Sequence, residues 1–374
     1  MKKVASKIVM IQLYSNGDSL YATAVARQIK HDFPDCYLIW AIASFCKNII
    51  LNNPYVDEIM EVDSVRKNDI AAYRKFKKSI LIKQEKGVYD HVFAINNIDT
   101  NQCYYDGTMR GNILRAYPRQ ITVPLQPVLR LLPEEIAKVD RFVEEHSLRK
   151  YKQVLLFEYA PQSGQSNITK EYALSFSEKI VEHGNYAIIL SSANPIVHAN
   201  PAVIDGSGLT LRETAYLTQY CTFLVGTSSG ITWASTSDCG KILPMVQLLN
   251  PYARWSNSVS LDFKRFNISN QGVIEVWDFD QEKLVDCVLL ALNDFSGAYD
   301  VYNKTLPIHF KTTRSIVYNL LCYLEFKYII KHIRVNLGQY GFNLSFFGAI
   351  FGGVLSFPFK LIRNLVVKHL LKKN

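Results

Sequence analysis

The alternation of strand-like and helix-like segments is the feature that most limits how this chain can fold. Short apolar runs rich in β-branched residues alternate with segments whose apolar residues recur at helical spacing. Such alternation is typical of βαβ units, in which helices cover a parallel sheet. In the first half we expect strands at residues 7–14, 36–43 and 89–96, and helices at residues 19–30 and 133–149.

A second series of the same kind follows the polar segment 149–152, which we interpret as a linker. It comprises expected strands at residues 154–159, 186–191, 222–225, 241–248 and 273–277, helices at residues 170–182, 211–221 and 282–292, and one helix that begins at Ile231. The two series predict an α/β protein with two Rossmann-like domains, residues 1–150 and 151–306, that face each other across a cleft.

Composition supports packed cores and a reducing environment. Hydrophobic residues make up 48% of the 374 residues and charged residues 20%, which excludes a chain that is disordered throughout. The seven cysteines include no pair at CxxC spacing and most lie in apolar runs, so we expect buried free thiols. The first apolar run, residues 8–13, is too short for an export signal, and we therefore expect a cytoplasmic protein.

The last segment, residues 307–374, differs in charge from the rest of the chain. It holds ten of the 42 Lys and Arg residues but one of the 33 Asp and Glu residues, so it carries the whole net charge of +9. Residues 335–359 are uncharged and rich in Phe, and in residues 360–373 Lys and Arg alternate with Leu, Ile and Val. This pattern favours a helical tail that attaches the protein peripherally to the anionic inner face of the cell membrane.

Two alternatives remain for the tail, namely a helix packed on the first domain and a membrane-spanning helix. Nucleic acid is not expected as a partner, because a nucleic-acid-binding protein more often spreads its basic residues over the folded body.

A candidate catalytic base follows the first expected strand. Gly17 allows the chain to turn closely, and Asp18 lies at the start of the next helix, at the carboxyl edge of a parallel sheet where ligands bind. A carboxylate that faces the cleft is able to take a proton from a substrate hydroxyl group. The alternative is a helix cap, a common role for Asp at such a place.

Two polar turns of the second domain are candidates for phosphate binding, because small hydroxyl residues and glycine before a helix offer N–H and O–H donors. The candidates in the first turn are Ser163, Gly164, Gln165, Ser166 and Lys170. A polar loop capped by Thr169 is the alternative there. The second turn has the stronger pattern and contains Thr227, Ser228, Ser229 and Gly230. We expect Gly230 to supply any unusual backbone angle.

No metal site is expected. Asp278 and Asp280 have the spacing of a metal-binding pair, but they lie between a strand and a helix, so we interpret Asp280 as a helix N-cap. The eight histidines form no HxH or HxxxH pair, and the sequence contains neither a GxSxG motif nor a P-loop. These features argue against a metalloenzyme, a serine hydrolase and a P-loop ATPase.

Several stretches together resemble the heptosyltransferase-like glycosyltransferases, family 9 of the GT-B fold. In the first half these are residues 17–20 (Gly-Asp-Ser-Leu), 33–35 (Phe-Pro-Asp) and 53–59 (Asn-Pro-Tyr-Val-Asp-Glu-Ile). In the second half, residues 211–215 and 223–230 resemble the helix and strand ahead of the family's donor-binding turn. The resemblance covers residues 7–292 in order and spacing.

The resemblance implies a GT-B enzyme in which Asp18 is the base and Glu213 and the turn 227–230 contact a nucleotide-sugar. The implied reaction transfers a sugar, with inversion, to a bacterial surface glycan or glycolipid such as lipopolysaccharide. The nucleotide-sugar is a co-substrate, and neither a cofactor nor a metal is implied. Ser228 and Trp233 stand where the family has Asp and His, which leaves the donor sugar open. A non-catalytic GT-B binding protein and a nucleotide-sugar epimerase are the alternatives.

Overall fold

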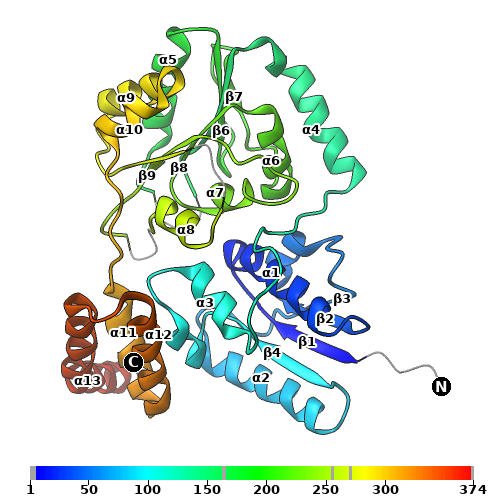
Figure 1. Ribbon diagram of the computed structural model, residues 1–374, viewed down its shortest axis with the longest axis vertical. Coiled ribbons are helices and arrows are strands. Elements are labelled where there is room, and N and C mark those ends of the chain that lie inside the picture. The colour runs from blue at the N-terminus through cyan, green and yellow to red at the C-terminus, as the bar shows by residue number, and fades with distance from the viewer. Residues whose placement is uncertain (1–5, 162–165, 254–256, 269–271, 372–374) are drawn as a thin grey trace.

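The computed structural model describes residues 6–161, 166–253, 257–268 and 272–371, and confirms the expected α/β class with two parallel sheets (Figure 1). The first sheet has the order β3-β2-β1-β4. Its strands are β1 (Lys7–Ile11), β2 (Tyr37–Ile42), β3 (Glu58–Glu61) and β4 (His91–Ala94), and its helices are α1 (Asn16–Asp32), α2 (Ile70–Glu85) and α3 (Met109–Ala116). The central strand β1 is apolar and buried from its second residue on, as expected for a parallel strand covered on both faces.

The second sheet has six parallel strands in the order β10-β9-β8-β5-β6-β7. The strands are β5 (Gln153–Glu158), β6 (Tyr186–Ser191), β7 (Val203–Asp205), β8 (Phe223–Gly226), β9 (Met245–Leu248) and β10 (Val273–Val276). The associated helices are α4 (Pro133–Glu145), α5 (Lys170–Glu182), α6 (Leu211–Leu217), α7 (Gly230–Ala234), α8 (Val259–Arg265), α9 (Gln281–Asn293) and α10 (Phe295–Tyr302). The winding reverses between β5 and β8, as it does between β1 and β4, and sheets of this order bind ligands at that point.

The C-terminal segment forms α11 (Lys311–Cys322), α12 (Phe326–Tyr340) and α13 (Leu344–Leu371), which lie beside the first domain (Figure 1). The inner side of α12 is bonded to the loop that follows the short 3₁₀ helix η2 (Asp99–Tyr104). Asn336 Nδ2 donates to Tyr105 O over 3.0 Å, and the Tyr340 hydroxyl donates to Asp106 O over 2.6 Å. This part of the segment is therefore packed on the first domain. None of the helices in the described ranges has the length and apolarity that a membrane crossing requires.

Candidate functional site

Asp18 lies in the first turn of α1, directly after the central strand of the first sheet. The N-cap is Ser15, and Asp18 accepts a hydrogen bond from the backbone N–H of that residue. Burial raises the pKa of Asp18 to about 7, although Lys67 and the Ser15 N–H act in the opposite direction. A carboxylate in this state exchanges a proton near neutral pH, as a general base must.

The turn 227–230 follows β8 at the reversal point of the second sheet. Ser228 has a left-handed backbone with φ of 56°, and its N–H donates to Gln247 Oε1 over 2.7 Å. The Ser228 hydroxyl donates to Asn257 O over 2.9 Å, which fixes the turn. Thr227 is 1% exposed and its hydroxyl has no hydrogen-bond partner among the residues that the structure describes, so it is a buried donor that a ligand could engage.

Glu158, the last residue of β5, is a further candidate that sequence reasoning missed. Its carboxylate accepts the backbone N–H of Ile231 over 3.1 Å, at the start of α7. Burial raises the pKa of Glu158 to about 7, against the lowering effect of the Ser229 hydroxyl and of the N–H groups of Ile231 and Thr232. A donor phosphate at this turn would therefore lie next to a carboxyl group of the protein. The sequence signal that could have indicated Glu158 is a single charged residue at the end of an apolar strand.

The two domains meet close to both candidate sites. Tyr21 on α1 and Trp233 on α7 are in edge-to-face contact, with ring centroids 5.7 Å apart. Asp18 and Gly230 each lie three residues before these rings, about 4.5 Å along a helix axis. The fold thus brings the expected base and the expected donor turn to the same interdomain contact.

Arg110 on α3 is a buried cation at this contact. Its guanidinium lies 4.5 Å from the Tyr21 ring centroid and 5.5 Å from that of Trp233. Its Nε donates to Asp262 Oδ2 of α8 over 3.0 Å, an ion pair that joins the two domains. Sequence reasoning missed this pair because its members are 152 positions apart.

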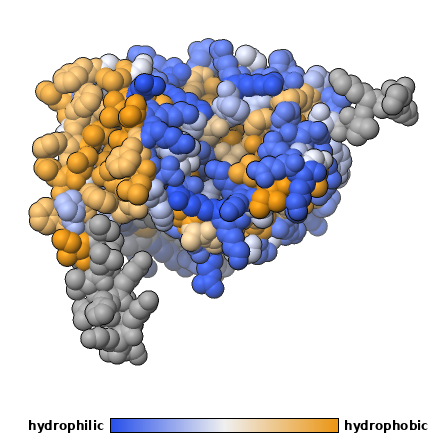
Figure 2. Space-filling view, turned by 90° about the horizontal axis from the view of Figure 1, so that it is seen from below, coloured by the Kyte–Doolittle hydropathy of each residue, from blue (hydrophilic) through white to orange (hydrophobic). Residues whose placement is uncertain are grey.

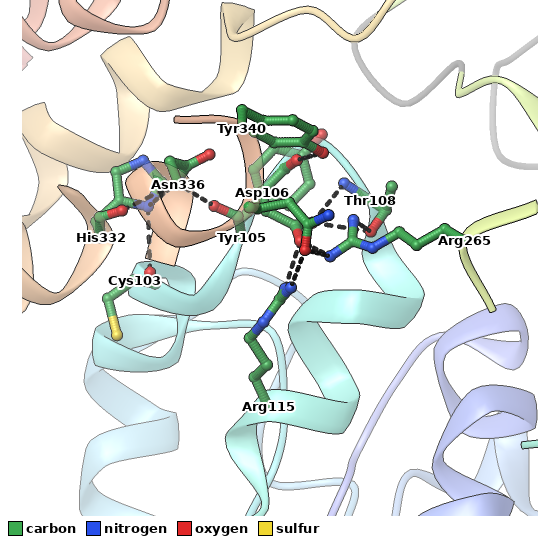
Figure 3. A network of polar contacts seen from close by, with 10 residues as sticks. Cys103, Tyr105, Asp106, Thr108, Arg115, Arg265, His332, Asn336 and Tyr340 are labelled. Atoms are coloured by element: carbon green, nitrogen blue, oxygen red, sulfur yellow. Dashed lines mark hydrogen bonds and ion pairs between the residues drawn. The ribbon is translucent and has the colours of Figure 1, made fainter. Parts of the chain in front are cut away.

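A second polar network joins both domains to the C-terminal segment (Figure 3). Asp106 is fully buried and forms ion pairs with Arg115 of α3 and Arg265 of α8. Gln339 Oε1 of α12 accepts from Arg115 Nη2 over 3.1 Å and from Arg265 Nη2 over 2.9 Å. Burial alone would raise the pKa of Asp106, but the Arg265 hydrogen bond and the two guanidinium charges hold it below its usual value. Asp106 thus stays ionised and holds three parts of the chain together.

The other predicted phosphate-binding turn lies between β5 and α5. Ser163, Gly164 and Gln165 are outside the described residues. Ser166 Oγ accepts from Ile168 N over 3.1 Å, and the exposed Lys170 donates to Pro195 O over 3.2 Å. Thr169 caps α5, as one alternative expected, by accepting from Tyr172 N.

Glu213 is buried in the first turn of α6. It forms a reciprocal capping box with Thr210, and its Oε2 accepts from Lys138 Nζ of α4 over 2.9 Å. Its carboxylate therefore stabilises the fold, and contact with a nucleotide stays a prediction.

The carboxylate pair after β10 has partners within the protein. Asp280 caps α9 by accepting from Lys283 N over 3.0 Å, as expected, and Asp278 Oδ2 pairs with Lys283 Nζ over 2.7 Å. In the described part of the chain, no three His, Cys, Asp or Glu side chains are grouped so that they could hold a metal ion. All seven cysteines are free, and five are buried, which confirms the expectation from their apolar surroundings.

The two facing, doubly wound domains define the GT-B class of fold. No family model matches the sequence, and no curated protein matches it. Among solved structures, the chain is similar to a glycosyl transferase family 9 protein from Veillonella parvula, with 14% identity over 81% of this chain and 95% of that one and a TM-score of 0.50. It is also similar to E. coli ADP-heptose LPS heptosyltransferase II, with 14% identity over 77% of this chain and 99% of that one and a TM-score of 0.51. These likenesses confirm the fold expected from the sequence resemblance.

Proposed function

We propose that the protein is a glycosyltransferase that moves a sugar from a nucleotide-sugar donor to a glycan or glycolipid acceptor. The observation that carries the proposal is Asp18, a carboxyl group with a pKa of about 7 that lies one helical turn from the interdomain contact. The fold likeness and the sequence resemblance support the class of reaction. By resemblance, the acceptor is a bacterial surface glycan of the lipopolysaccharide kind.

In the proposed reaction Asp18 takes the proton of an acceptor hydroxyl while that oxygen bonds to the anomeric carbon of the donor sugar. The bond from the anomeric carbon to the phosphate oxygen breaks on the opposite face, so the configuration inverts and a nucleoside diphosphate leaves. Hydroxyl and N–H donors of the turn 227–230 would stabilise the negative charge of the leaving group. Neither a metal nor a further cofactor has a role in this scheme. A cytoplasmic location is part of the proposal, because nucleotide-sugars would be supplied there.

The proposal is tested with the full-length protein, a panel of nucleotide-sugars and membrane glycolipid extracts. Asp18→Asn should lower the rate of transfer by about 10² to 10⁴, the usual contribution of a general base. The exposed Asp35→Asn is the matched control and should keep the wild-type rate. Activity should also survive EDTA.

Other outcomes would replace the proposal. A full rate in Asp18→Asn would remove Asp18 as the base. An isomerised sugar formed without acceptor would identify an epimerase, and nucleotide binding by calorimetry without turnover would identify a binding protein.

A further inference from the structure

The outer face of α13 is apolar and exposed. Leu344, Phe351, Leu355, Phe359 and Ile362 follow one another at spacings of seven, four, four and three residues, which places them on one side of the helix, and each is more than half exposed. Figure 2 shows hydrophobic residues gathered over this end of the molecule. Soluble proteins rarely leave a contiguous apolar patch of this kind without a partner.

Packing on the inner side fixes the direction in which this face points. Phe346 is 1% exposed and its ring centroid lies 5.2 Å from that of Phe310. Gly353 lies so close to α11 that a Cβ there would be 2.9 Å from Val317 Cβ. Helix α13 is therefore held against α11 by one face, and the apolar face is the opposite one.

A cationic stripe lies on the outer side of α12. Lys327, Lys331 and Arg334 line an open concavity of about 610 Å³. Lys327 and Arg334 lie across the helix from His332 and Asn336, which are buried against the first domain, whereas Lys331 lies at the edge of the stripe and donates to the Tyr104 hydroxyl over 2.6 Å.

Apolar side chains lie next to this cationic stripe. Phe326 and Ile330 are each more than half exposed and occupy the adjacent strip of the helix surface. Cationic and apolar strips side by side are typical of helices that lie in the interface of an anionic bilayer.

We propose that the outer faces of α12 and α13 form a docking surface for an anionic lipid bilayer. The apolar side chains of α13 enter the acyl boundary, and the cations of α12 bind lipid phosphates. Charge favours a bilayer over a second copy of this chain: the outer face of α12 presents Lys327, Lys331 and Arg334, and the only acid in the sequence of residues 307–374 is Glu325, so two such faces would repel each other. The docking surface goes beyond the proposed sugar transfer and does not depend on it.

The test is flotation of the full-length protein with vesicles of phosphatidylglycerol and phosphatidylethanolamine. The double variant Phe351→Ser/Leu355→Ser should weaken vesicle binding at least tenfold at both low and high salt, because the lost contribution is apolar. Lys327→Gln/Arg334→Gln should weaken it about 30-fold at 0.1 M salt. That second difference should nearly vanish at 1 M salt, where the Debye length is about 3 Å.

The matched controls lie outside the C-terminal segment. Val197→Ser removes an apolar side chain that is 93% exposed and is the control for the apolar variant. Lys150→Gln/Lys152→Gln removes two exposed cations and is the control for the charge variant. Both should bind vesicles like the wild type, and all variants should keep the wild-type Tm. A wild-type chain that stays unbound at low salt overturns the proposal, as does an equal loss of binding in the controls. A dimer that Phe351→Ser/Leu355→Ser converts to monomer, without vesicle binding, would assign the face to a second copy.

Discussion

Asp18 titrates in the range in which the proposed enzyme would work. A base must be ionised, so kcat/KM should rise with pH, reach half its maximum near pH 7 and level off about one unit higher. Lys67 lowers the pKa of Asp18, and Lys67→Met should therefore shift the midpoint to higher pH. The exposed Lys78→Met serves as control. Initial rates between pH 5.5 and 8.5 measure this, and a profile that is flat across neutral pH would contradict it.

Glu158 should make stability fall as the pH rises. Its pKa is about 7 when folded against a usual value of 4.5, so the folded state holds the proton more tightly. Below pH 4.5 Glu158 is protonated in both the folded and the unfolded state, so its contribution to stability is fully present. Between pH 4.5 and 7 the free energy of unfolding should drop by about 3 kcal/mol because of this one group.

Urea unfolding of Glu158→Gln tests this prediction, because the drop should be smaller by that amount in the variant. The exposed Glu145→Gln should retain the wild-type dependence. If the free energy of unfolding depends on pH in the same way in Glu158→Gln and in the wild type, the folded state does not hold the Glu158 proton more tightly than the unfolded state does.

Residue roles could be predicted from the sequence only where they depend on near neighbours. The caps formed by Thr169 and Asp280 use N–H groups three positions away; the Asp280 cap was predicted, and the Thr169 cap was one of two alternatives. The partners of Glu158 and Arg110 lie 73 and 152 positions away. No local pattern indicates which charge meets which helix after folding, so these residues were missed.

At the scale of elements, the turn 227–230 has its unusual backbone angle at a different residue than expected. Gly230 is the first residue of α7, and a Cβ there would only be in ordinary contact with Leu211, at 3.6 Å. Ser228 has the left-handed backbone instead. Serine adopts that conformation at modest cost, whereas a β-branched residue is strongly disfavoured.

Ser228→Val should therefore weaken nucleotide binding more than Gly230→Ala does. We expect a loss of tenfold or more in Ser228→Val, from about 1–2 kcal/mol of backbone strain and the lost bond to Asn257 O. Gly230→Ala should change the affinity less than threefold. Calorimetry with nucleoside diphosphates measures both. Equal and small effects would show that this turn does not bind the nucleotide.

The element bounds were predicted best for two elements of the second domain, whereas the 16-residue helix α2 was not expected. Helix α5 and strand β6 have the expected bounds, residues 170–182 and 186–191. Strands β3 and β7 were missed because four and three residues are too few to establish alternation. The helix expected at 211–221 ends at Leu217 and continues as a 3₁₀ turn.

At the scale of the whole molecule, the C-terminal segment should be needed for stability. A chain that ends at Leu306 loses the partners of Tyr105 O and Asp106 O and exposes the Tyr105 side chain, which packs against Ile316 and Leu320 of α11. We expect its Tm to fall by about 5 °C or more, or the chain to aggregate.

A milder variant separates this role from membrane docking. Asn336→Leu removes one buried hydrogen-bond donor and should lower the Tm. Vesicle binding should not change, because the Asn336 side chain faces the first domain. An unchanged Tm in the chain that ends at Leu306 would contradict the prediction.

The two-domain plan could be predicted because each domain repeats a local pattern of strand and helix. The packing of α11 and α12 on the first domain was only one of the alternatives for the tail, because charge and hydropathy indicate that a helix is amphipathic but not which surface it meets. Composition pointed to a tail on a membrane, whereas the described structure gives α12 a polar inner side bonded to the first domain.

The bonds between α12 and the first domain also affect how the chain is made. The carbonyl groups of Cys103, Tyr105 and Asp106 find their partners 229 to 234 positions later. Translation proceeds at about 5–20 residues per second, so the ribosome adds these partners more than ten seconds after the loop has been synthesised. The second domain is complete on the nascent chain before the first one is. The first domain must therefore wait, with this loop uncovered, until α12 has been synthesised.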